Sequence, residues 1–400
     1  MALGTIAVVG GSLAGLRAVE ALRRLGFDGR IEWIGAEPHA PYDRPPLSKH
    51  VLRGEWEPER IALARGGLDG LCAELRFGVR AQRLDTAARR IELSDGASVA
   101  WDGLVVATGA AARRLPGQPD LDGVFVLRTL DDALAIRAAL ERGPRVVVVG
   151  GGFIGAEVAA SCRQRGLEVA MVEALGNPLE LALGPEIGAL FAAIHRDRGV
   201  ALHTGKAVAA IEGDRRVERV RLADGHAIPA DVVIVGIGVR PETAWLEGSG
   251  VAWGDGVVCD DHCATSVPNV VAAGDVARFF HARYGEAMRV EHWTNAVEQA
   301  EAAVATLLHG PASTPPYTPV PYVWSDQYDA KLAVAGKPRA GDAMRVVDGS
   351  LADRKFVAIF GRAGRLTGAL GLNRMRKLMD WRKALHDDLS WDEALARGEA

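Results

Sequence analysis

The sequence predicts an α/β protein with two similar strand–turn–helix units, followed by a smaller α+β domain at its C-terminal end. An apolar strand pattern runs into a glycine-rich turn twice, at residues 5–15 and again at 145–155. An amphipathic helical pattern and a second apolar strand follow each turn, as in a βαβ unit. The residues after the Pro- and Thr-rich stretch 311–321 carry no such turn and mix short strands with a helix.

Composition and charge indicate a globular protein and argue against a nucleic-acid-binding or membrane-spanning one. The chain has 400 residues, 48% hydrophobic and 24% charged, which suits two to three globular domains. A net charge of −4 argues against a general nucleic-acid binder. No apolar run approaches the ~20 residues of a membrane helix. Four cysteines fit a reducing compartment, and the first strand begins too early for a signal peptide, so we expect a cytoplasmic protein.

The first glycine-rich turn has the pattern of a dinucleotide-binding site. Residues 6–9 are a continuous apolar run, typical of a buried parallel strand. Gly10-Gly11-Ser12 then forms a tight turn into a helix, and a second strand at 31–34 leads to Glu37. In such Rossmann-like units the helix N-terminus holds a pyrophosphate and the acid accepts hydrogen bonds from the ribose. Ser12 replaces the usual second glycine: its Cβ crowds the pyrophosphate, although its hydroxyl can donate to it. Taken alone, the pattern also fits a plain βαβ unit.

The second turn matches the dinucleotide pattern in full. Residues 150–155 read G-G-G-F-I-G, and the strand at 168–172 leads to Glu173, about 20 residues past the third glycine. An acid at this position repels a 2′-phosphate, so we expect NAD rather than NADP. Two dinucleotide folds in one chain indicate electron transfer between a flavin and a nicotinamide.

Other segments are expected to connect or complete these units. The proline-rich stretch 41–49 should be rigid and irregular, because adjacent prolines disfavour helix and sheet interior. The stretch 311–321 should be a linker, and a polar tail should close the chain. The remaining expected elements are short strands within 75–104 and 217–222, buried strands at 104–109, 231–235 and 269–275, a helix through Gln299 and Leu307, strands at 331–335 and 355–360, and a basic amphipathic helix at 373–385.

Six motifs together resemble one known family across nearly the whole chain. They are V-V-G-G-S-L-A-G at 8–15, P-Y-D-R-P-P-L-S-K at 41–49, V-V-A-T-G at 105–109, V-V-V-G-G-G-F-I-G-A-E at 147–157, A-A-G-D-V at 272–276 and W-S-D-Q-Y at 324–328. The family is that of the FAD-dependent NADH–ferredoxin reductases coupled to oxygenases, with a glutathione-reductase-like fold. The resemblance implies an FAD domain at 1–111 and 238–315, an inserted NADH domain at 112–237, and a C-terminal domain at 316–400 that covers the flavin.

The resemblance also assigns residues to the cofactors. Gly10, Gly15 and Glu37 would hold the ADP half of FAD, and Asp275 would bind the ribityl chain. The full set of expected cofactor-binding residues is Gly10, Ser12, Leu13, Ala14, Gly15, Glu37, Arg44, Lys49, Thr108, Gly109, Gly150, Gly152, Phe153, Ile154, Gly155, Glu173, Gly238, Gly274, Asp275, Glu291, His292, Trp293 and Trp324.

Two residues are the catalytic candidates that the resemblance implies. Lys49 would lie along the flavin with Arg44, where its charge suits a reduced ring, and it would pair with Glu157. Trp293 and Trp324 would border the ring. The plainer alternatives are that Glu157 is a charge near a helix N-terminus and that Trp324 is a core aromatic residue.

The expected reaction needs positioning more than acid–base chemistry. Hydride would pass from NADH to FAD, and electrons would leave singly for a [2Fe–2S] ferredoxin that serves a cytochrome P450 or a Rieske oxygenase. The spacing from Cys259 to Cys263 is wrong for a redox pair, and the further ligands that zinc would need are missing, so we expect structural thiols and no metal.

An acidic ferredoxin should dock on basic residues of the C-terminal helix. The candidates are Arg374, Arg376, Lys377, Arg382 and Lys383, while Met375, Leu378, Met379 and Leu385 should face inward. A merely solvated basic face is the alternative. Two further functions stay open: an NADH oxidase or rubredoxin reductase on the same scaffold, and an NADH-sensing interaction protein similar to apoptosis-inducing factor.

Overall fold

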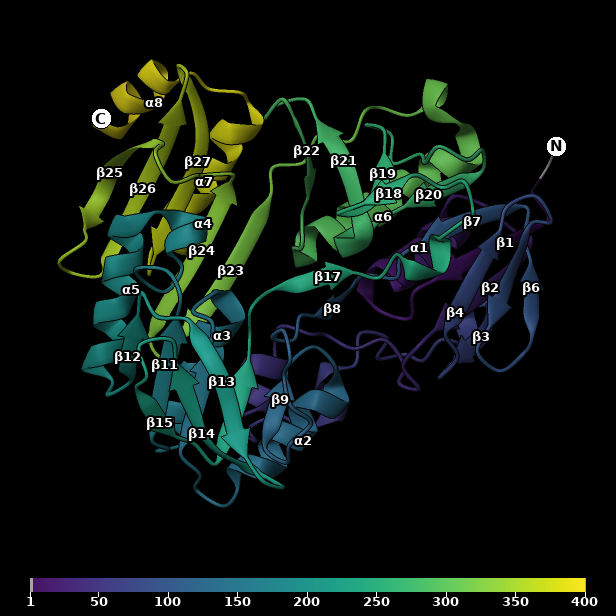
Figure 1. The fold of residues 1–400 in the computed structure, drawn as a ribbon. Helices are drawn as coiled ribbons and strands as arrows, with labels where there is room; N and C mark the ends of the chain where they lie inside the picture. The colour runs from purple at the N-terminus through teal and green to yellow at the C-terminus, as the bar shows by residue number, and fades with distance from the viewer. Residues whose placement is uncertain (1–2, 400) are drawn as a thin grey trace. The chain divides into compact units, whose positions relative to one another are not determined.

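The chain divides into two compact units. The computed structural model describes residues 3–399. The first unit comprises Met1–Asp43, Ala62–Ala111 and Arg240–Pro321, and the second comprises Arg44–Ile61, Ala112–Val239 and Tyr322–Ala400. The chain passes between them for the third and fourth time at the short strands β8 (Ala110–Ala112) and β17 (Val239–Pro241) (Figure 1). Each unit therefore draws on three separate stretches of sequence.

A five-stranded parallel sheet forms the core of the first unit. Its spatial order is β20 (Val270–Ala272), β7 (Gly103–Val106), β1 (Thr5–Val9), β2 (Arg30–Gly35) and β3 (Glu74–Phe77). Residues 6–9 are buried in the central strand β1, which explains their unbroken apolar pattern. Helices α1 (Leu13–Arg24) and α6 (Trp293–His309) pack on this sheet and against each other.

Two antiparallel sheets complete the first unit. One consists of β4 (Ala81–Asp85), β5 (Arg90–Leu93) and β6 (Ser98–Ala100). The other contains β18 (Trp253–Gly254), β19 (Gly256–Cys259), β21 (Ala277–His281) and β22 (Glu286–Arg289), with one parallel pair between β19 and β21. The short strands expected within 75–104 correspond to β3 to β7.

The second unit repeats the parallel architecture. Its sheet has the order β12 (Ala201–Thr204), β11 (Val169–Glu173), β10 (Val146–Val149), β16 (Val232–Val235) and β9 (Val124–Val126). Its helices are α2 (Leu130–Leu140), α3 (Phe153–Gln164), α4 (Glu180–Leu183) and α5 (Pro185–Asp197), and its small antiparallel sheet has strands β13 (Val208–Gly213), β14 (Val217–Leu222) and β15 (Ala227–Pro229). The fold class predicted from the sequence is confirmed.

The C-terminal part of the second unit is an antiparallel sheet with two helices (Figure 1). The strand order is β23 (Tyr322–Gln327), β24 (Ala330–Gly336), β27 (Arg365–Leu372), β26 (Lys355–Arg362) and β25 (Ala343–Ser350), followed by α7 (Met375–His386) and α8 (Trp391–Glu399). Apolar residues of α5 and of β24, β26 and β27 share one core. The residues expected to form a polar tail contain the short helix α8, of which only Ala394 is buried.

Helix α7 corrects a second expectation. Leu378 and Leu385 are buried as expected, together with Trp381. Met379, expected to face inward, is 43% exposed. It lies one position after Leu378, and neighbouring positions on a helix point about 100° apart.

The segment 44–61 is not wholly irregular. Adjacent prolines at 45 and 46 end just where a π-helical turn begins, at Leu47–Val51. A proline before the first turn loses no helical hydrogen bond, since the first N–H groups have no partner there. The expectation of irregular structure through Lys49 was therefore wrong, and Lys49 sits on this helical turn.

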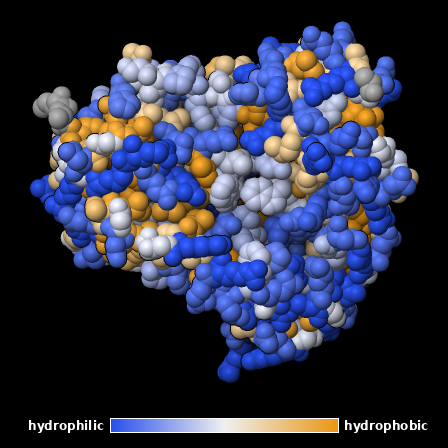
Figure 2. All heavy atoms as spheres, turned by 180° about the vertical axis from the view of Figure 1, so that it is seen from behind, coloured by the Kyte–Doolittle hydropathy of each residue, from blue (hydrophilic) through white to orange (hydrophobic). Residues whose placement is uncertain are grey.

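One face of the molecule is mostly polar. Figure 2 shows one face, where hydrophilic side chains predominate and apolar ones are exposed in small groups. Within residues 3–399, every helix is too short or too polar to cross a membrane.

Candidate functional site

The first glycine turn packs so tightly that two of its glycines admit no side chain. Gly10 has φ +141°, and a Cβ there would lie 2.0 Å from the Ala107 carbonyl oxygen. A Cβ on Gly15 would lie 1.8 Å from the Gly10 carbonyl oxygen. The Trp33 indole donates a hydrogen bond to that same oxygen at 2.9 Å. The turn thus brings the N-terminus of α1 to the carboxyl end of β1, where phosphates bind in such folds.

Ser12 occupies the N-cap of α1 without capping it. Its backbone is extended, with φ −112°, and its side chain makes no capping hydrogen bond to the helix. The first backbone N–H groups of α1 are thus not engaged by an N-cap side chain. Leu13 and Ala14 open the helix, and a Cβ on Gly274 would lie 3.0 Å from the Ala14 Cβ. This end of α1 therefore fits a pyrophosphate, and Ser12 does not distort it.

The other expected residues of the first unit follow its parallel strands. Glu37 comes after β2 and accepts a hydrogen bond from the Tyr42 hydroxyl. Thr108 and Gly109 come after β7, and the Thr108 hydroxyl donates to the Glu242 carbonyl oxygen at 2.8 Å. Because carboxyl ends of parallel strands share one edge of a sheet, these residues gather with the glycine turn.

Asp275 stands in the turn after β20, close to the start of α6. Arg289 donates to the Asp275 carbonyl oxygen at 3.0 Å and pairs with Glu291 at 2.5 Å. His292 is the N-cap of α6; burial lowers the pKa of its imidazole to about 4, while the Asp275 carboxylate opposes this shift. Trp293 follows, and its indole donates to the Asp43 carboxylate at 2.9 Å.

The second glycine turn combines two tight glycines with an open one. Gly150 has φ +103°, and a Cβ there would lie 2.3 Å from the Gly236 carbonyl oxygen. A Cβ on Gly155 would lie 1.9 Å from the Gly150 carbonyl oxygen. Gly152, the N-cap of α3, has φ −68° and nothing within 4 Å of its Cβ position. The space over this helix N-terminus, where Phe153 and the half-exposed Ile154 follow, is open to a pyrophosphate.

Glu173 closes the same turn from the end of β11. Its carboxylate accepts hydrogen bonds from the Gly151 N–H at 2.6 Å and from the Leu175 N–H at 2.8 Å. Gly238, with φ +93°, accepts from the Arg113 N–H through its carbonyl at 2.9 Å. The acid predicted for the ribose is therefore beside the turn predicted for the pyrophosphate.

Lys49 and Glu157 form a buried ion pair inside the second unit. The Lys49 Nζ lies 2.7 Å from Glu157 Oε2, and the two side chains are 6% and 3% exposed. Arg44 donates to the Arg128 carbonyl oxygen at 2.6 Å, also in the second unit. Trp324 lies on β23. The residues expected around the flavin ring are therefore divided between the units: Trp293 and Asp275 belong to the first, and Arg44, Lys49 and Trp324 to the second.

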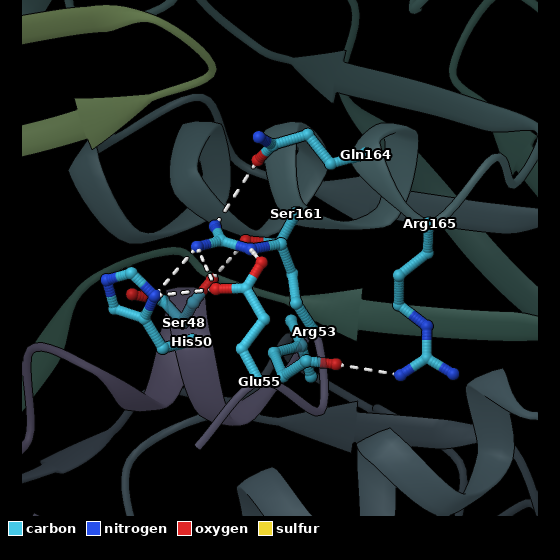
Figure 3. Close-up of polar contacts among 8 residues, drawn as sticks. Ser48, His50, Arg53, Glu55, Ser161, Gln164 and Arg165 are labelled. Atoms are coloured by element: carbon cyan, nitrogen blue, oxygen red, sulfur yellow. Dashed lines mark hydrogen bonds and ion pairs between the residues drawn. The ribbon is translucent and has the colours of Figure 1, made fainter.

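One face of helix α3 forms hydrogen bonds with the segment 44–61, which carries Lys49. The Ser161 hydroxyl donates to the Ser48 carbonyl oxygen at 2.6 Å, Arg165 to the Leu52 carbonyl oxygen at 2.9 Å, and Arg53 to the Gln164 side chain at 3.3 Å (Figure 3). Positions 157, 161, 164 and 165 recur at helical spacing, which puts them on the same side. These anchors were not predicted from the sequence; their signal was a set of polar residues at i, i+4, i+7 and i+8 of a largely apolar helix.

Burial makes most of the cysteine thiols unreactive. All four cysteines are free, and three of them are buried. Burial raises the pKa values of the Cys162 and Cys259 thiols to about 12. These thiols are protonated at neutral pH and are poor nucleophiles.

Comparison with known proteins agrees with this geometry. Residues 4–300 match the family model described as pyridine nucleotide-disulphide oxidoreductase, and residues 322–400 match the reductase C-terminal model. The chain is 40% identical over 389 residues to the 5,5′-dehydrodivanillate O-demethylase ferredoxin reductase subunit of a Sphingobium species, covering 95% of this chain and 92% of that one. It is 33% identical to putidaredoxin reductase of Pseudomonas putida, covering 99% of this chain and 94% of that one.

A solved structure extends the likeness to three dimensions. The covalent putidaredoxin reductase–putidaredoxin complex matches with a TM-score of 0.92 at 32% identity, over 97% of this chain and 94% of that one. Two dinucleotide folds with this C-terminal domain define an oxidoreductase that uses FAD and NADH. The chain belongs to the pyridine nucleotide-disulphide oxidoreductase family, in the group of ferredoxin reductases of oxygenase systems. The resemblance inferred from the six motifs is confirmed.

Proposed function

We propose that this protein takes electrons from NADH and delivers them, through FAD, to a [2Fe–2S] ferredoxin that serves an oxygenase. The observation that supports this proposal most directly is the pair of glycine turns. Each turn leads into a helix whose N-terminus receives no capping hydrogen bond from the N-cap side chain. When bound, FAD accepts two electrons from NADH and can release them one at a time, which matches a one-electron acceptor. Relatives whose names specify ferredoxin reductases, and the putidaredoxin complex, support this partner.

The residues of the chain divide the binding work. In the first unit, the N-terminus of α1 would hold the FAD pyrophosphate, while Glu37 and Asp275 would accept hydrogen bonds from sugar hydroxyls. In the second unit, the N-terminus of α3 would hold the NADH pyrophosphate and Glu173 its ribose. We assign FAD to residues 1–111 and 238–315, NADH to 112–237, and the third domain to 316–400. The cytoplasmic location stays a prediction.

Lys49 and Glu157 are the residues that we propose act at the flavin. An ammonium group held in a buried site favours negative charge nearby, and Glu157 fixes the position of that ammonium group. Neither residue needs to act as a nucleophile. Their work is to place a charge, which is the usual contribution of a protein to cofactor chemistry.

Anaerobic stopped-flow spectroscopy tests the proposal. The purified holoprotein is mixed with NADH and then with a [2Fe–2S] ferredoxin. We expect NADH to bleach the flavin absorption band and ferredoxin to restore it quickly. Bleaching that only oxygen reverses would indicate the NADH oxidase instead. Bleaching that neither acceptor reverses would indicate the NADH-sensing protein, and no flavin band would refute the cofactor assignment.

A further inference from the structure

Glu157 is a junction of three chain segments within the second unit. Its side chain is 3% exposed. Its Oε2 atom accepts from the Ser48 hydroxyl at 2.6 Å and faces the Lys49 ammonium group at 2.7 Å. Its Oε1 atom accepts from the Ser325 hydroxyl of β23 at 2.7 Å. The C-terminal domain therefore binds the carboxylate on the oxygen that Lys49 leaves unoccupied.

The contact with Ser325 continues as a chain of hydrogen bonds. The Gln327 Nε2 atom donates to the Ser325 Oγ atom at 3.2 Å. The Gln327 Oε1 atom lies 3.0 Å from His195 Nε2, and His195 Nδ1 lies 3.2 Å from the Tyr328 hydroxyl. Ser325, Gln327 and His195 each have no exposed surface. The chain ends at the hairpin between β23 and β24, where the Arg198 guanidinium covers the Tyr328 ring.

The chemistry of the groups fixes the direction of every bond. A carboxylate only accepts, so the Ser325 hydroxyl must donate to Glu157 and can then accept from the Gln327 amide. The Gln327 carbonyl faces His195 Nε2, which must therefore carry the proton, and the Tyr328 hydroxyl donates to Nδ1. Burial lowers the pKa of His195 to about 4, so the ring is neutral at pH 7, as this arrangement requires. All four donors point toward Glu157.

We propose that Ser325, Gln327 and His195 are positioning residues that hold the Glu157 carboxylate against Lys49. This inference rests on the proposed role of the Lys49–Glu157 pair and gives the C-terminal domain a part in that role. A row of aligned donors polarises along its length and stabilises the negative charge at its end. The strand geometry supports it: Ser325 and Gln327 share the buried face of β23, because alternate residues of a strand point to the same side.

A spectroscopic test reads the carboxylate directly. The carboxylate stretching band of Glu157 is obtained from holoprotein with ¹³C-labelled glutamate, as the infrared difference between the wild type and Glu157→Gln. We expect Ser325→Ala to shift this band most, Gln327→Leu less and His195→Gln least, because each break is farther from the carboxylate. Ser325→Thr keeps a hydroxyl and should restore the wild-type position.

Ser249→Ala is the matched control. The Ser249 hydroxyl is also buried, but it lies in the first unit and donates to the Leu246 carbonyl oxygen at 2.6 Å. It should leave the band in place. A band that moves equally in Ser249→Ala and Ser325→Ala, or in neither, would overturn the proposal. Circular dichroism checks that each variant is folded, and Gln327→Leu, which breaks the next hydrogen bond, carries the test if Ser325→Ala is not.

A kinetic measurement separates this inference from the proposed function. The rate of flavin reduction at saturating NADH should fall several-fold from wild type to Ser325→Ala, with the NADH concentration at half-maximal rate unchanged, since the second glycine turn is intact. If Glu157→Gln leaves this rate unaltered while the infrared shifts follow the expected order, the role of the ion pair in the reaction fails and the positioning chain stands. If Glu157→Gln slows flavin reduction but none of the variants shifts the band, the ion pair acts in the reaction and the proposed positioning chain is refuted.

Discussion

The Glu173 carboxylate closes over the turn before α3: its Oε2 atom accepts a hydrogen bond from the Gly151 N–H at 2.6 Å. The same carboxylate accepts from the Leu175 N–H at 2.8 Å. An acid fixed by two backbone donors at the end of β11 presents a constant negative charge to the ribose site. That charge underlies the predicted preference for NADH over NADPH.

Replacing Glu173 by arginine should reverse this electrostatic bias. We expect Glu173→Arg to change the ratio of kcat/KM values for NADH and NADPH by tenfold or more in favour of NADPH, because a guanidinium attracts the 2′-phosphate. Glu168→Arg, at an exposed position directly before β11, makes an identical charge change and should leave the ratio unaltered. An unchanged ratio in Glu173→Arg would contradict the assignment of this residue.

The open position at Gly152 allows binding and folding to be tested separately. Gly152→Ala places a Cβ where no protein atom lies within 4 Å, at an ordinary φ of −68°. We expect the melting temperature to stay near the wild-type value, while the Kd for NADH rises because the methyl group enters the pyrophosphate space. Gly155→Ala is the contrast: its Cβ would lie 1.9 Å from the Gly150 carbonyl oxygen, so both stability and NADH binding should fall. Calorimetry of unfolding and fluorescence titration measure the two effects.

The buried pair of Lys49 and Glu157 should show strong energetic coupling. Removing one partner leaves a buried charge alone, which typically costs about 3–5 kcal/mol. We expect Lys49→Met and Glu157→Gln each to lower the free energy of unfolding markedly, and the double variant to be more stable than the sum of both losses implies. Urea unfolding of the four proteins completes the double-mutant cycle. If the losses in unfolding free energy of the two single variants simply add in the double variant, Lys49 and Glu157 are not energetically coupled.

His195 should make the protein sensitive to mild acid. Its pKa is 6.5 when unfolded and about 4 when folded. Between these values the unfolded state holds more protons, so stability falls as the pH drops, by up to about 1.4 kcal/mol per pH unit. Above pH 6.5 this contribution is constant. His195→Gln should flatten the slope of unfolding free energy against pH in this window, whereas His309→Gln, at an exposed position, should not. Equal slopes in wild type and His195→Gln would refute this account.

The predicted docking face on α7 is tested best at a basic residue for which no ion pair within the described part of the chain competes. Arg374 pairs with Asp348 at 2.9 Å, Lys383 with Asp387 at 3.1 Å, and Arg382 stacks over the Tyr322 ring. Arg376 is exposed and gives the cleanest test. We expect Arg376→Glu to raise the KM for a [2Fe–2S] ferredoxin several-fold at low salt and to leave the KM for NADH alone. Arg196→Glu on α5 is the charge-matched control. Equal effects of the two variants would argue against docking on α7.

The two nucleotide-binding folds could be predicted from the sequence because the patterns that indicate them are local. A buried strand, a turn with glycines at fixed spacing and an acid about 20 residues later are all contained in one βαβ unit. The replacement of the usual second glycine by Ser12 was also evident from the sequence. The backbone of Ser12 is extended, a conformation that any residue adopts, so the helix tolerates a side chain there. The C-terminal sheet was predicted only in part, as strands corresponding to β24 and β26. The strand β27 was missed although the two-residue turn Ala363-Gly364, with positive φ at both residues, joins it to β26 as a hairpin.

The contacts around Glu157 could not be predicted from local patterns. Ser48, Ser161 and Ser325 are small polar residues in three different segments, and nothing near each of them in sequence marks it as a partner of the others. Only the packing of α3 against both β23 and the segment 44–61 brings them together. The inward orientation expected for Met379 failed for a related reason: hydrophobicity alone does not tell which of two adjacent apolar residues, Leu378 or Met379, faces the sheet.

The threefold alternation of the chain between its units also constrains its biosynthesis. The first sheet lacks its edge strand β20 until residue 272 has been made, and the second unit lacks β23 to β27 until residue 372 has emerged. Residues 44–61 are translated long before helix α3, which holds them. The first unit therefore cannot complete its fold until residue 321 has been made, and the second cannot until its C-terminal sheet follows. Until β20 is made, β7 stays unpaired on the side where β20 belongs, and an unpaired apolar strand edge is the condition under which chaperones act.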